Sequence, residues 1–344
     1  MNQKFDFKDI TLVPENISSI NHRYQVDLYN EDRKLPIIVS PMDTVVSDEN
    51  YNDFLAEDFE VCLPRGEFVN DNRVFISFSL DEFQEFLDIY DSKKGKNVES
   101  IKILVDVANG HMQRLYDLTK RFCENRVSEN HKIMIGNIAN PKTYETYANL
   151  GVDYIRVGIG GGSGCLTSAN TGIHYPMASL INECYTIKLN GDYNTKIVAD
   201  GGFRNYDDII KALALGADYV MLGGVLNKCL ESCGEIKLFG KITINENTAR
   251  TIWRKYPKFR KYLYKSFRGM STKEVQKKWN KSVLKTSEGI VKLNKIEYTL
   301  KQWSDNLKDY LKSAMSYTNS EDLNSFKGSE YVFISENALK RFNK

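Results

Sequence analysis

A glycine-rich loop with one thiol is the stretch of this sequence best suited to chemistry. Four of the five residues 160–164 are glycine, the fifth is Ser163, and Cys165 follows at once. Ordering such a backbone costs entropy, so we expect it where the main chain must approach a ligand closely. Its bare N–H groups could bind a phosphate, and Cys165 could act as a nucleophile on whatever the phosphate anchors. A flexible surface loop holding an inert cysteine is the alternative.

Other polar candidates come at or just after short apolar runs. They are Asp43, Asp106, Asn137, Asp200 and the glycine pairs Gly201-Gly202 and Gly223-Gly224. An ionised carboxylate such as Asp200 can accept both hydroxyl protons of a ribose diol. The two glycine pairs, together with Ser163, could form a phosphate cup that needs no arginine. A tight turn would explain either pair alone, but their joint placement favours the phosphate site.

The elements that must position these residues are eight short apolar runs, separated by segments of helical length. The runs are 36–40, 59–63, 74–78, 101–105, 132–135, 152–157, 195–199 and 219–222, and amphipathic segments lie at 81–92, 111–126, 141–150 and 205–215. Strands that alternate with helices predict parallel pairing through right-handed crossovers. Eight such units fit a (β/α)8 TIM barrel better than an open sheet. In that barrel the carboxyl ends of the strands form the active rim, and the loops after strands 7 and 8 usually bind phosphate.

We predict a single catalytic domain over residues 1–344. The barrel is expected at about 35–230, a flap and basic insertion at about 235–295 and a C-terminal segment at 296–344. Residues 250–281 carry twelve Lys and Arg against one acidic residue, with aromatic residues interleaved. That composition can mark a nucleic-acid surface. A solvated helical face with its aromatic residues packed is more common, and we expect this second arrangement and no nucleic-acid partner.

Composition narrows the class of protein. Hydrophobic residues make up 42% of the 344 residues and charged residues 27%, and a net charge of +2 gives no global argument for nucleic acid. The six cysteines form no CxxC or Cys/His cluster, so neither a zinc site nor a disulfide framework is expected, and reduced thiols indicate the cytoplasm. A signal peptide and an apolar run of about 18 residues are both absent from the sequence, so we expect no membrane association.

At this point the sequence resembles the family of IMP dehydrogenases and GMP reductases, from about residue 7 to about residue 340. The matching segments come in the family's order: 41–45, 106–110, the Cys165 loop, 200–202, 221–224 and 268–271. Three features resemble the GMP reductase branch more closely. Residues 106–110 and 171–176 have the reductase form, and the Arg-Tyr pair of the dehydrogenase flap is not evident after Ser271.

The resemblance implies an NADPH-dependent reductive deamination of GMP to IMP and ammonia. Cys165 would attack C2 of the purine to give a covalent thioimidate, with Thr167 and Glu288 as the proton relay. The resemblance also implies a homotetramer, and we expect no CBS regulatory domain, because no regulatory insertion follows the second strand. Four alternatives stay open: an IMP dehydrogenase that converts IMP to XMP with NAD, action on a related or modified purine nucleotide, an FMN-dependent barrel oxidase, and a nucleic-acid-binding or scaffolding protein on a retired barrel.

The resemblance also assigns binding residues by position. Those implied for the nucleotide are Ser163, Asp200, Gly201, Gly202, Gly223, Gly224, Gly269, Met270, Ser271, Lys285 and Gly289. Those implied for the cofactor are Arg23, Arg65, Asp106, Val107, Ala108, Ile159 and Gly160, and the backbone carbonyls implied for a monovalent cation, potassium, are Gly160, Gly162 and Cys165. The sequence departs from the family pattern at Leu166, Ser168 and Lys285, where the family has a threonine and two arginines, and at Pro64-Arg65.

Overall fold

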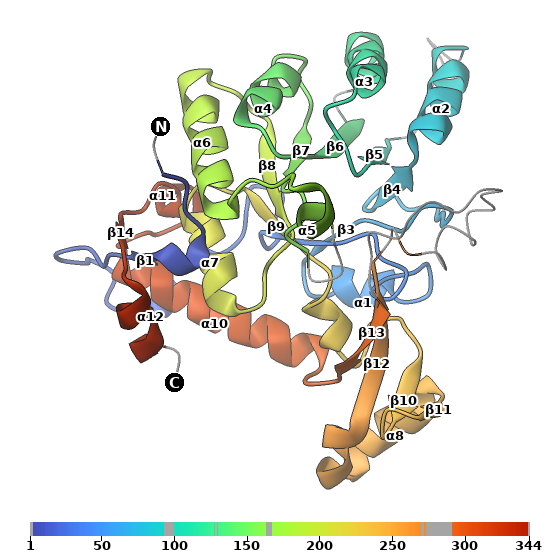
Figure 1. The fold of residues 1–344 in the computed structure, drawn as a ribbon, viewed down its shortest axis with the longest axis vertical. Helices are drawn as coiled ribbons and strands as arrows, with labels where there is room; N and C mark the ends of the chain where they lie inside the picture. The colour runs from blue at the N-terminus through green and yellow to red at the C-terminus, as the bar shows by residue number, and fades with distance from the viewer. Residues whose placement is uncertain are drawn as a thin grey trace.

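A closed parallel barrel forms the centre of the protein (Figure 1). The computed structural model describes residues 3–92, 100–126, 128, 130–162, 167–269, 272 and 291–342. Eight strands pair in the order β3-β2-β9-β8-β7-β6-β5-β4, and a parallel bridge between Cys62 and Phe75 joins the two outer strands. Their bounds are Ile37–Val39 (β2), Glu60–Val61 (β3), Phe75–Phe78 (β4), Lys102–Asp106 (β5), Lys132–Ile138 (β6), Tyr154–Val157 (β7), Lys196–Asp200 (β8) and Tyr219–Leu222 (β9). The predicted TIM barrel and all eight predicted strands are confirmed.

Helices between the strands cover the outside of the barrel. They are α1 (Tyr51–Leu55), α2 (Leu80–Ser92), α3 (Gln113–Asn125), α4 (Pro141–Ala148), α6 (Met177–Asn190) and α7 (Tyr206–Ala214). The short helix α5 (Thr167–Thr171) instead follows the glycine loop after β7 and has no buried residue. The four predicted amphipathic segments correspond to α2, α3, α4 and α7. Helix α6 was not predicted, because its first turns are buried on most sides and show no single apolar stripe. None of the helices in the described ranges combines the length and apolar character needed to cross a bilayer.

The side chains inside the barrel lie in layers, because alternate residues of each strand point inward. The central layers are mostly apolar and contain Ile38, Cys62, Phe75, Leu104, Met134, Tyr154, Val198, Tyr219 and Met221. On β5, Lys102, Leu104 and Asp106 therefore share the inward face, and on β8 Val198 shares it with Asp200. The barrel has an apolar middle with charged groups above and below it.

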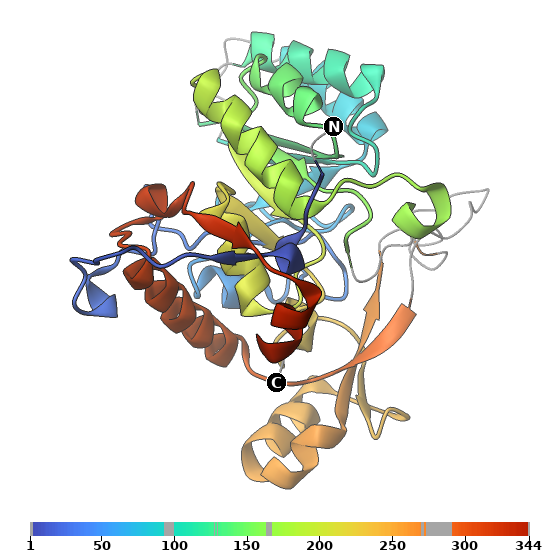
Figure 2. The same cartoon turned by 60° about the vertical axis from the view of Figure 1, so that its left-hand side comes forward.

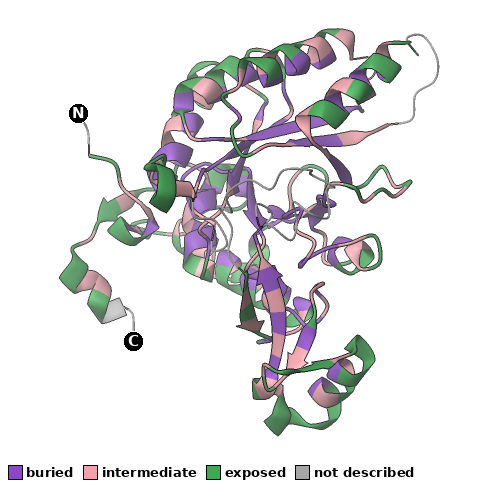
Figure 3. Cartoon of the chain, turned by 45° about the vertical axis from the view of Figure 1, so that its right-hand side comes forward, coloured by how far each residue is buried: buried purple, intermediate pink, exposed green. Residues whose placement is uncertain are grey.

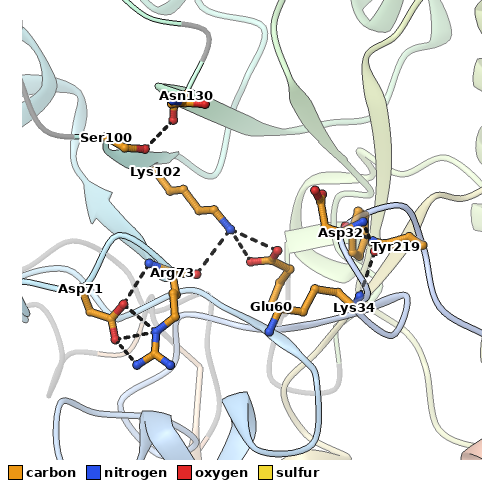
Figure 4. Close-up of polar contacts among 10 residues, drawn as sticks. Asp32, Lys34, Glu60, Asp71, Arg73, Ser100, Lys102, Asn130 and Tyr219 are labelled. Carbon is orange, nitrogen blue, oxygen red and sulfur yellow. Dashed lines mark hydrogen bonds and ion pairs between the residues drawn. The ribbon is translucent and has the colours of Figure 1, made fainter.

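The seam between β3 and β4 is the weakest part of the sheet, since one bridge replaces a ladder there. The ammonium of Lys102, on the next strand β5, spans this seam. Its Nζ lies 2.9 Å and 3.1 Å from the two carboxylate oxygens of Glu60 on β3, and 3.4 Å from the carbonyl oxygen of Arg73 just before β4 (Figure 4). The Glu60 side chain is 2% exposed. A buried carboxylate of this kind depends on its partner.

The two ends of the chain meet on the outside of the barrel. Strand β1 (Ile10–Leu12) pairs antiparallel with β14 (Tyr331–Phe333), which Figure 2 shows as adjacent blue and red segments. Short helical segments complete both ends: η1 (Phe7–Asp9), η2 (Arg23–Gln25), α11 (Leu323–Phe326) and α12 (Glu336–Phe342). The N-terminal segment therefore lies on the outside of the barrel, against the C-terminal one.

The helix that closes the barrel is separated from the last barrel strand, β9, by a long insertion. Helix α10 (Leu300–Tyr317) packs against α7 and buries Trp303, Leu307 and Leu311. Between β9 and α10 the chain first forms η3 (Leu226–Lys228) and then a separate antiparallel unit. The unit consists of β10 (Ile236–Leu238), β11 (Ile242–Ile244), α8 (Glu246–Lys255), η4 (Pro257–Tyr262), β12 (Leu263–Arg268) and β13 (Val291–Lys295), with strand order β11-β10-β12-β13. The helical expectation for 250–281 is thus wrong over 263–268, where alternate burial marks a strand.

A buried lysine ties this antiparallel unit to the barrel. Lys265 on β12 is fully buried, and its ammonium donates hydrogen bonds to the carbonyl oxygens of Cys229, Leu230 and Ser232. Burial lowers the pKa of Lys265 to about 8, so the side chain still carries its proton at neutral pH. The charge is therefore used to hold the segment after η3 against the sheet.

We predict that Lys102→Met lowers the free energy of unfolding by about 3 kcal/mol, because it leaves the buried Glu60 carboxylate without its partner. The double variant Glu60→Gln/Lys102→Met should lose less than the single variant, since no buried charge remains. Urea unfolding followed by tryptophan fluorescence measures both. The control is Lys120→Met, which removes an exposed lysine paired with Glu124 and should cost less than about 0.5 kcal/mol. Equal losses in Lys102→Met and Lys120→Met would contradict the role of the seam.

Candidate active site

A buried arginine links two of the predicted site residues across the mouth of the barrel. Nη1 of Arg156, on β7, lies 2.7 Å from Oδ1 of Asp106 at the end of β5. Its Nη2 and Nε lie 2.8 Å and 3.2 Å from Oδ2 of Asp200 at the end of β8. The predicted cofactor carboxylate and the predicted ribose carboxylate are thus bridged by one guanidinium.

The fold makes room for this arginine by removing a side chain from the neighbouring strand. Gly136 on β6 pairs with Arg156, and its φ of +144° is rare for residues with a side chain. A Cβ at position 136 would lie 2.5 Å from the Cβ of Arg156. The glycine therefore lets the arginine stem pass close to the strand and turn into the barrel.

The two carboxylates determine the electrostatics of the bridge. Burial by itself would lower the pKa of the Arg156 guanidinium, but the charges of Asp200 and Asp106 outweigh burial and raise that pKa. The arginine stays charged with only 7% of its side chain exposed. In turn the guanidinium offsets the negative charge of both carboxylates.

Asn137 completes the arrangement around Asp200. Its Nδ2 donates to Oδ2 of Asp200 at 2.7 Å and to the carbonyl oxygen of Gly158 at 2.9 Å. Every hydrogen bond and ion pair that Asp200 makes with the described residues goes to Oδ2. The orientation of the carboxylate is fixed through that oxygen, and among the described residues none donates a hydrogen bond to Oδ1.

The glycine loops after β7 and β8 are packed against each other. A Cβ at Gly201, whose φ is +102°, would lie 3.0 Å from the backbone nitrogen of Gly162. One at Gly202 would lie 3.3 Å from the carbonyl oxygen of Gly161. Glycine suits both positions, because their φ values are +102° and +91° and a side chain would crowd the facing loop. Bare main chain thus lines the rim next to Asp200, and such backbone can bind an anion through its N–H groups.

Two predicted loop residues already have partners for their carbonyl oxygens. The carbonyl of Gly160, implied as a cation ligand, accepts a hydrogen bond from Oγ of Ser168 at 3.1 Å. The carbonyl of Ile159 lies 3.0 Å from Nδ1 of His174. Ser168 stands where the family pattern has an arginine, so this chain uses the position to hold the glycine loop through a hydroxyl.

The root of the antiparallel unit lies beside the rim. Arg268, the last residue of β12, forms a two-pronged ion pair with Asp43, whose side chain is only 4% exposed. Arg268 pairs with Val291 of β13, so the chain leaves this unit and returns to it at neighbouring positions. Gly269 follows Arg268 and is buried.

The predicted glycine pair Gly223 and Gly224 follows β9, and Gly223 faces Ser40 and Met42 after β2.

The two predicted cofactor arginines lie in different places. Nε of Arg65 is 3.5 Å from Oδ2 of Asp106, which brings it to the site on the side away from Asp200. Arg23 lies on the outer side of the barrel, where its side chain is 53% exposed and 3.7 Å from Asp309 of α10. The structure does not bring Arg23 together with Asp106 within one chain.

Comparison with known proteins decides the family. A family model described as IMP dehydrogenase / GMP reductase domain matches residues 95–342. The chain belongs to the IMP dehydrogenase / GMP reductase family. It is 28% identical to a GMP reductase of Lactobacillus acidophilus over 351 residues, which cover 97% of this chain and 96% of that protein. It is 32% identical to a GMP reductase of Phytophthora infestans, with 83% and 78% covered, and 31% identical to GMP reductase 1 of Mus musculus, with 68% and 72% covered.

The catalytic residues implied by the family resemblance are only partly within the described residues. Thr167 is the first residue of α5, immediately after the glycine loop, and is half-buried. Those outside the described residues are Ser163, Cys165, Met270, Ser271, Lys285, Glu288 and Gly289. The other five cysteines are described, and burial raises the pKa of each thiol above its ordinary value. They are poor nucleophiles at neutral pH and serve in packing.

Sequence reasoning missed Arg156, although the sequence contained a signal for it. A barrel strand is buried on both faces, so a cation between Ile155 and Val157 must either lie in the barrel or have a buried partner. The run 152–157 was interpreted as a strand only. Asn137 was identified at a strand end, but no partner could be assigned to it without the register of β6 and β7.

We predict that Arg156→Met destabilises the protein by about 3 kcal/mol at pH 7, because two carboxylates that are only 14% and 15% exposed lose their shared cation. The loss should be smaller at pH 5, because protonation of either aspartate removes a charge that the variant no longer balances. Urea unfolding at pH 5 and pH 7 measures the difference. Arg156→Lys keeps a cation and should show a smaller loss with little added pH dependence. Equal stability of Arg156→Met and the unsubstituted protein at pH 7 would contradict the bridge.

Proposed function

We propose that this protein is an NADPH-dependent GMP reductase, which converts GMP to IMP and ammonia. The observation that carries the proposal is the cup of glycine backbone next to an oriented Asp200, in a family member whose relatives named above are GMP reductases. Such a cup suits a 5′-phosphate, and a fixed carboxylate at its edge suits a ribose. A purine ring attached to that ribose would extend towards the loop that contains Cys165.

In this proposal the nucleotide is held at both its phosphate and its sugar. The N–H groups of the loops 160–163, 201–202 and 223–224 bind the phosphate. Oδ1 of Asp200 accepts from the ribose hydroxyls, while Arg156 and Asn137 hold the carboxylate through Oδ2. Residues 269–271, Lys285 and Gly289 contact the base. Fixing both ends of the nucleoside places C2 of the purine within reach of one thiolate, which supplies much of the rate enhancement through positioning.

The chemistry follows from the electrophile. The purine C2 is a weak electrophile, so a thiolate rather than a hydroxyl is needed to attack it. Cys165 adds to C2, the exocyclic amine leaves as ammonia once it is protonated through Thr167 and Glu288, and a thioimidate remains. Asp106, Val107 and Ala108 would hold NADPH, which would supply the hydride that no side chain can provide. Addition of that hydride at C2 would break the C2–S bond, giving IMP and releasing the Cys165 thiolate. Arg65 lies beside Asp106, so it is in position to favour an anionic cofactor.

Potassium, a tetramer and a cytoplasmic location belong to the same proposal. The carbonyls of Gly160, Gly162 and Cys165 would supply oxygen ligands of the type that hard cations prefer, and Oγ of Ser168 adds a further oxygen next to Gly160. Because Arg23 lies away from Asp106 in its own chain, a cofactor contact by Arg23 would need a neighbouring copy. Unpaired cysteines among the described residues are compatible with the reducing cytoplasm.

We predict that Cys165→Ala reduces GMP-dependent NADPH oxidation by at least about a thousandfold, because the covalent step loses its nucleophile. Absorbance at 340 nm and an ammonia assay follow the reaction. Intact mass spectrometry after incubation with GMP alone should show a covalent nucleotide adduct on the unsubstituted protein and none on Cys165→Ala. The control is Cys123→Ala, at a half-buried cysteine of α3 on the outside of the barrel, which should keep both adduct and activity. NADH formation from IMP without GMP turnover would instead identify an IMP dehydrogenase.

We also predict that Asp200→Asn raises KM for GMP by about 10- to 100-fold, because the donors of Arg156 and Asn137 require the amide oxygen, which leaves the NH2 group, a donor, facing the ribose hydroxyls. The unsubstituted enzyme should discriminate against 2′-deoxy-GMP, and the variant should lose most of that discrimination. Steady-state kinetics with both nucleotides gives the ratio of kcat/KM. A variant that keeps the full preference for GMP would remove Asp200 from the ribose site. Unfolding measurements on the same sample separate this effect from loss of the Arg156 bridge.

A further inference from the structure

Four aromatic rings form a continuous row at the far end of the antiparallel unit, and we call this row the aromatic strip. It runs Phe239, Tyr262, Phe259, Tyr256, with ring centroids 4.8 Å, 6.2 Å and 6.4 Å apart along the row. Phe239 lies in the β10–β11 turn, and the other three lie at the end of α8 and in η4. The β10–β11 turn and the segment from the end of α8 through η4 thus place their rings side by side.

The aromatic strip is exposed to solvent. Tyr256 is 54% exposed, while Phe259 and Phe239 are each 47% exposed. The core of this unit is built from other residues, among them Ile236, Trp253 and Leu263. The expectation that the aromatic residues of 250–281 pack inside is therefore wrong for Tyr256 and Phe259, although it holds for Trp253 and Phe267. Exposed rings of this size in a row mark an interaction surface.

Positive charge is concentrated around the strip. Residues 236–269 contain ten Lys and Arg and a single acidic residue, Glu246, which gives +9 in a chain whose total is +2, so the rest of the chain carries −7. The exposed cations near the strip are Lys241, Arg254, Lys255, Lys258 and Lys261. Nζ of Lys261 lies 5.0 Å from the centroid of the Tyr262 ring. Figure 3 shows that this end of the protein is largely exposed.

We propose that the aromatic strip and its flanking lysines bind single-stranded nucleic acid. Unpaired bases offer flat faces that stack on aromatic rings, and the phosphates between them meet the cations. Duplex nucleic acid hides its base faces, so it could use only the cations. An acidic protein surface would also meet the charge, but it gives no reason for a row of half-exposed rings. Only single-stranded nucleic acid would use both the rings and the cations of this surface.

The proposed surface lies apart from the candidate active site. Arg268 and Val291 hold one end of the β12–β13 pair beside Asp43 at the barrel rim. The aromatic strip lies at the other end, beyond Leu263, where Figure 1 shows α8 and the β10–β11 turn well away from α5. Variants in the strip are therefore expected to leave nucleotide turnover unchanged, and their effects test this proposal independently of the proposed reductase activity.

The direct test is fluorescence anisotropy with 5′-labelled 20-mers of poly(U), poly(dT) and a duplex of the same length, at 50 to 200 mM salt. We expect the single strands to bind more tightly than the duplex, with affinity that falls as salt rises by a slope of about 0.7 per phosphate contacted. Comparison of poly(U) with poly(dT) shows whether RNA or DNA is preferred. Absence of single-strand binding at 50 mM salt would overturn the proposal.

Two variants separate stacking from charge. Tyr256→Ala/Phe259→Ala should weaken single-strand binding about tenfold and leave the salt slope unchanged. Lys255→Ala/Lys258→Ala/Lys261→Ala should weaken binding at least tenfold and reduce the slope by about 2. The matched control is Lys8→Ala/Lys120→Ala/Lys142→Ala, which removes three exposed lysines elsewhere and should bind normally. Circular dichroism and thermal unfolding of each variant verify the fold.

Two outcomes would overturn the assignment in other ways. If the control triple variant loses as much affinity as the strip lysine variant, binding is a property of overall charge. If heparin binds as tightly as poly(U) and Tyr256→Ala/Phe259→Ala does not affect poly(U) binding, the surface captures polyanions without recognising bases. Unchanged affinity in the strip lysine variant would locate the binding site elsewhere on the protein.

Discussion

The Arg156 bridge is the interaction on which the candidate site depends. Three strands deliver charged side chains to the top of the barrel, and each charge would be costly there alone. Arg156 offsets this cost, because its guanidinium pairs with both Asp106 and Asp200. The same contact orients the two carboxylates that the proposal assigns to cofactor and ribose. The geometry of one arginine thus couples the two halves of the site.

Charged side chains have different roles at the two ends of the barrel. At the lower end Lys102 and Glu60 close a seam that lacks a strand ladder, so charge there serves stability. At the upper end the Asp106 and Asp200 carboxylates face a rim of bare glycine backbone, where charge can serve a ligand. Apolar layers separate the two ends. Because the layers keep water out, each ion pair depends strongly on its partner, as expected for buried charge.

The periodicity of the sequence was sufficient to predict the barrel, because each strand is short, apolar and followed by a helical segment. The rim residues followed from strand ends alone. The contacts that position them did not, since the Arg156 bridge depends on register among β5, β7 and β8 and on the missing side chain of Gly136. Helix α6 was not predicted, because it is buried on most sides and its sequence shows no single apolar stripe. In the segment 250–281, alternating Leu263, Lys265 and Phe267 indicated a strand, but the buried lysine disguised the apolar alternation.

The antiparallel unit interrupts the barrel at its last connection, between β9 and α10. The chain leaves β9 with its eight strands already paired, and only the closing helix α10 remains to be added. An insertion there delays that helix without separating any strands. Lys265 and the Asp43–Arg268 pair hold the unit at its base, whereas its far end makes its own small core. Because the unit is anchored at its base and has its own core at the far end, exposed rings and positive charge at that end have little effect on the barrel. The aromatic strip lies at this far end.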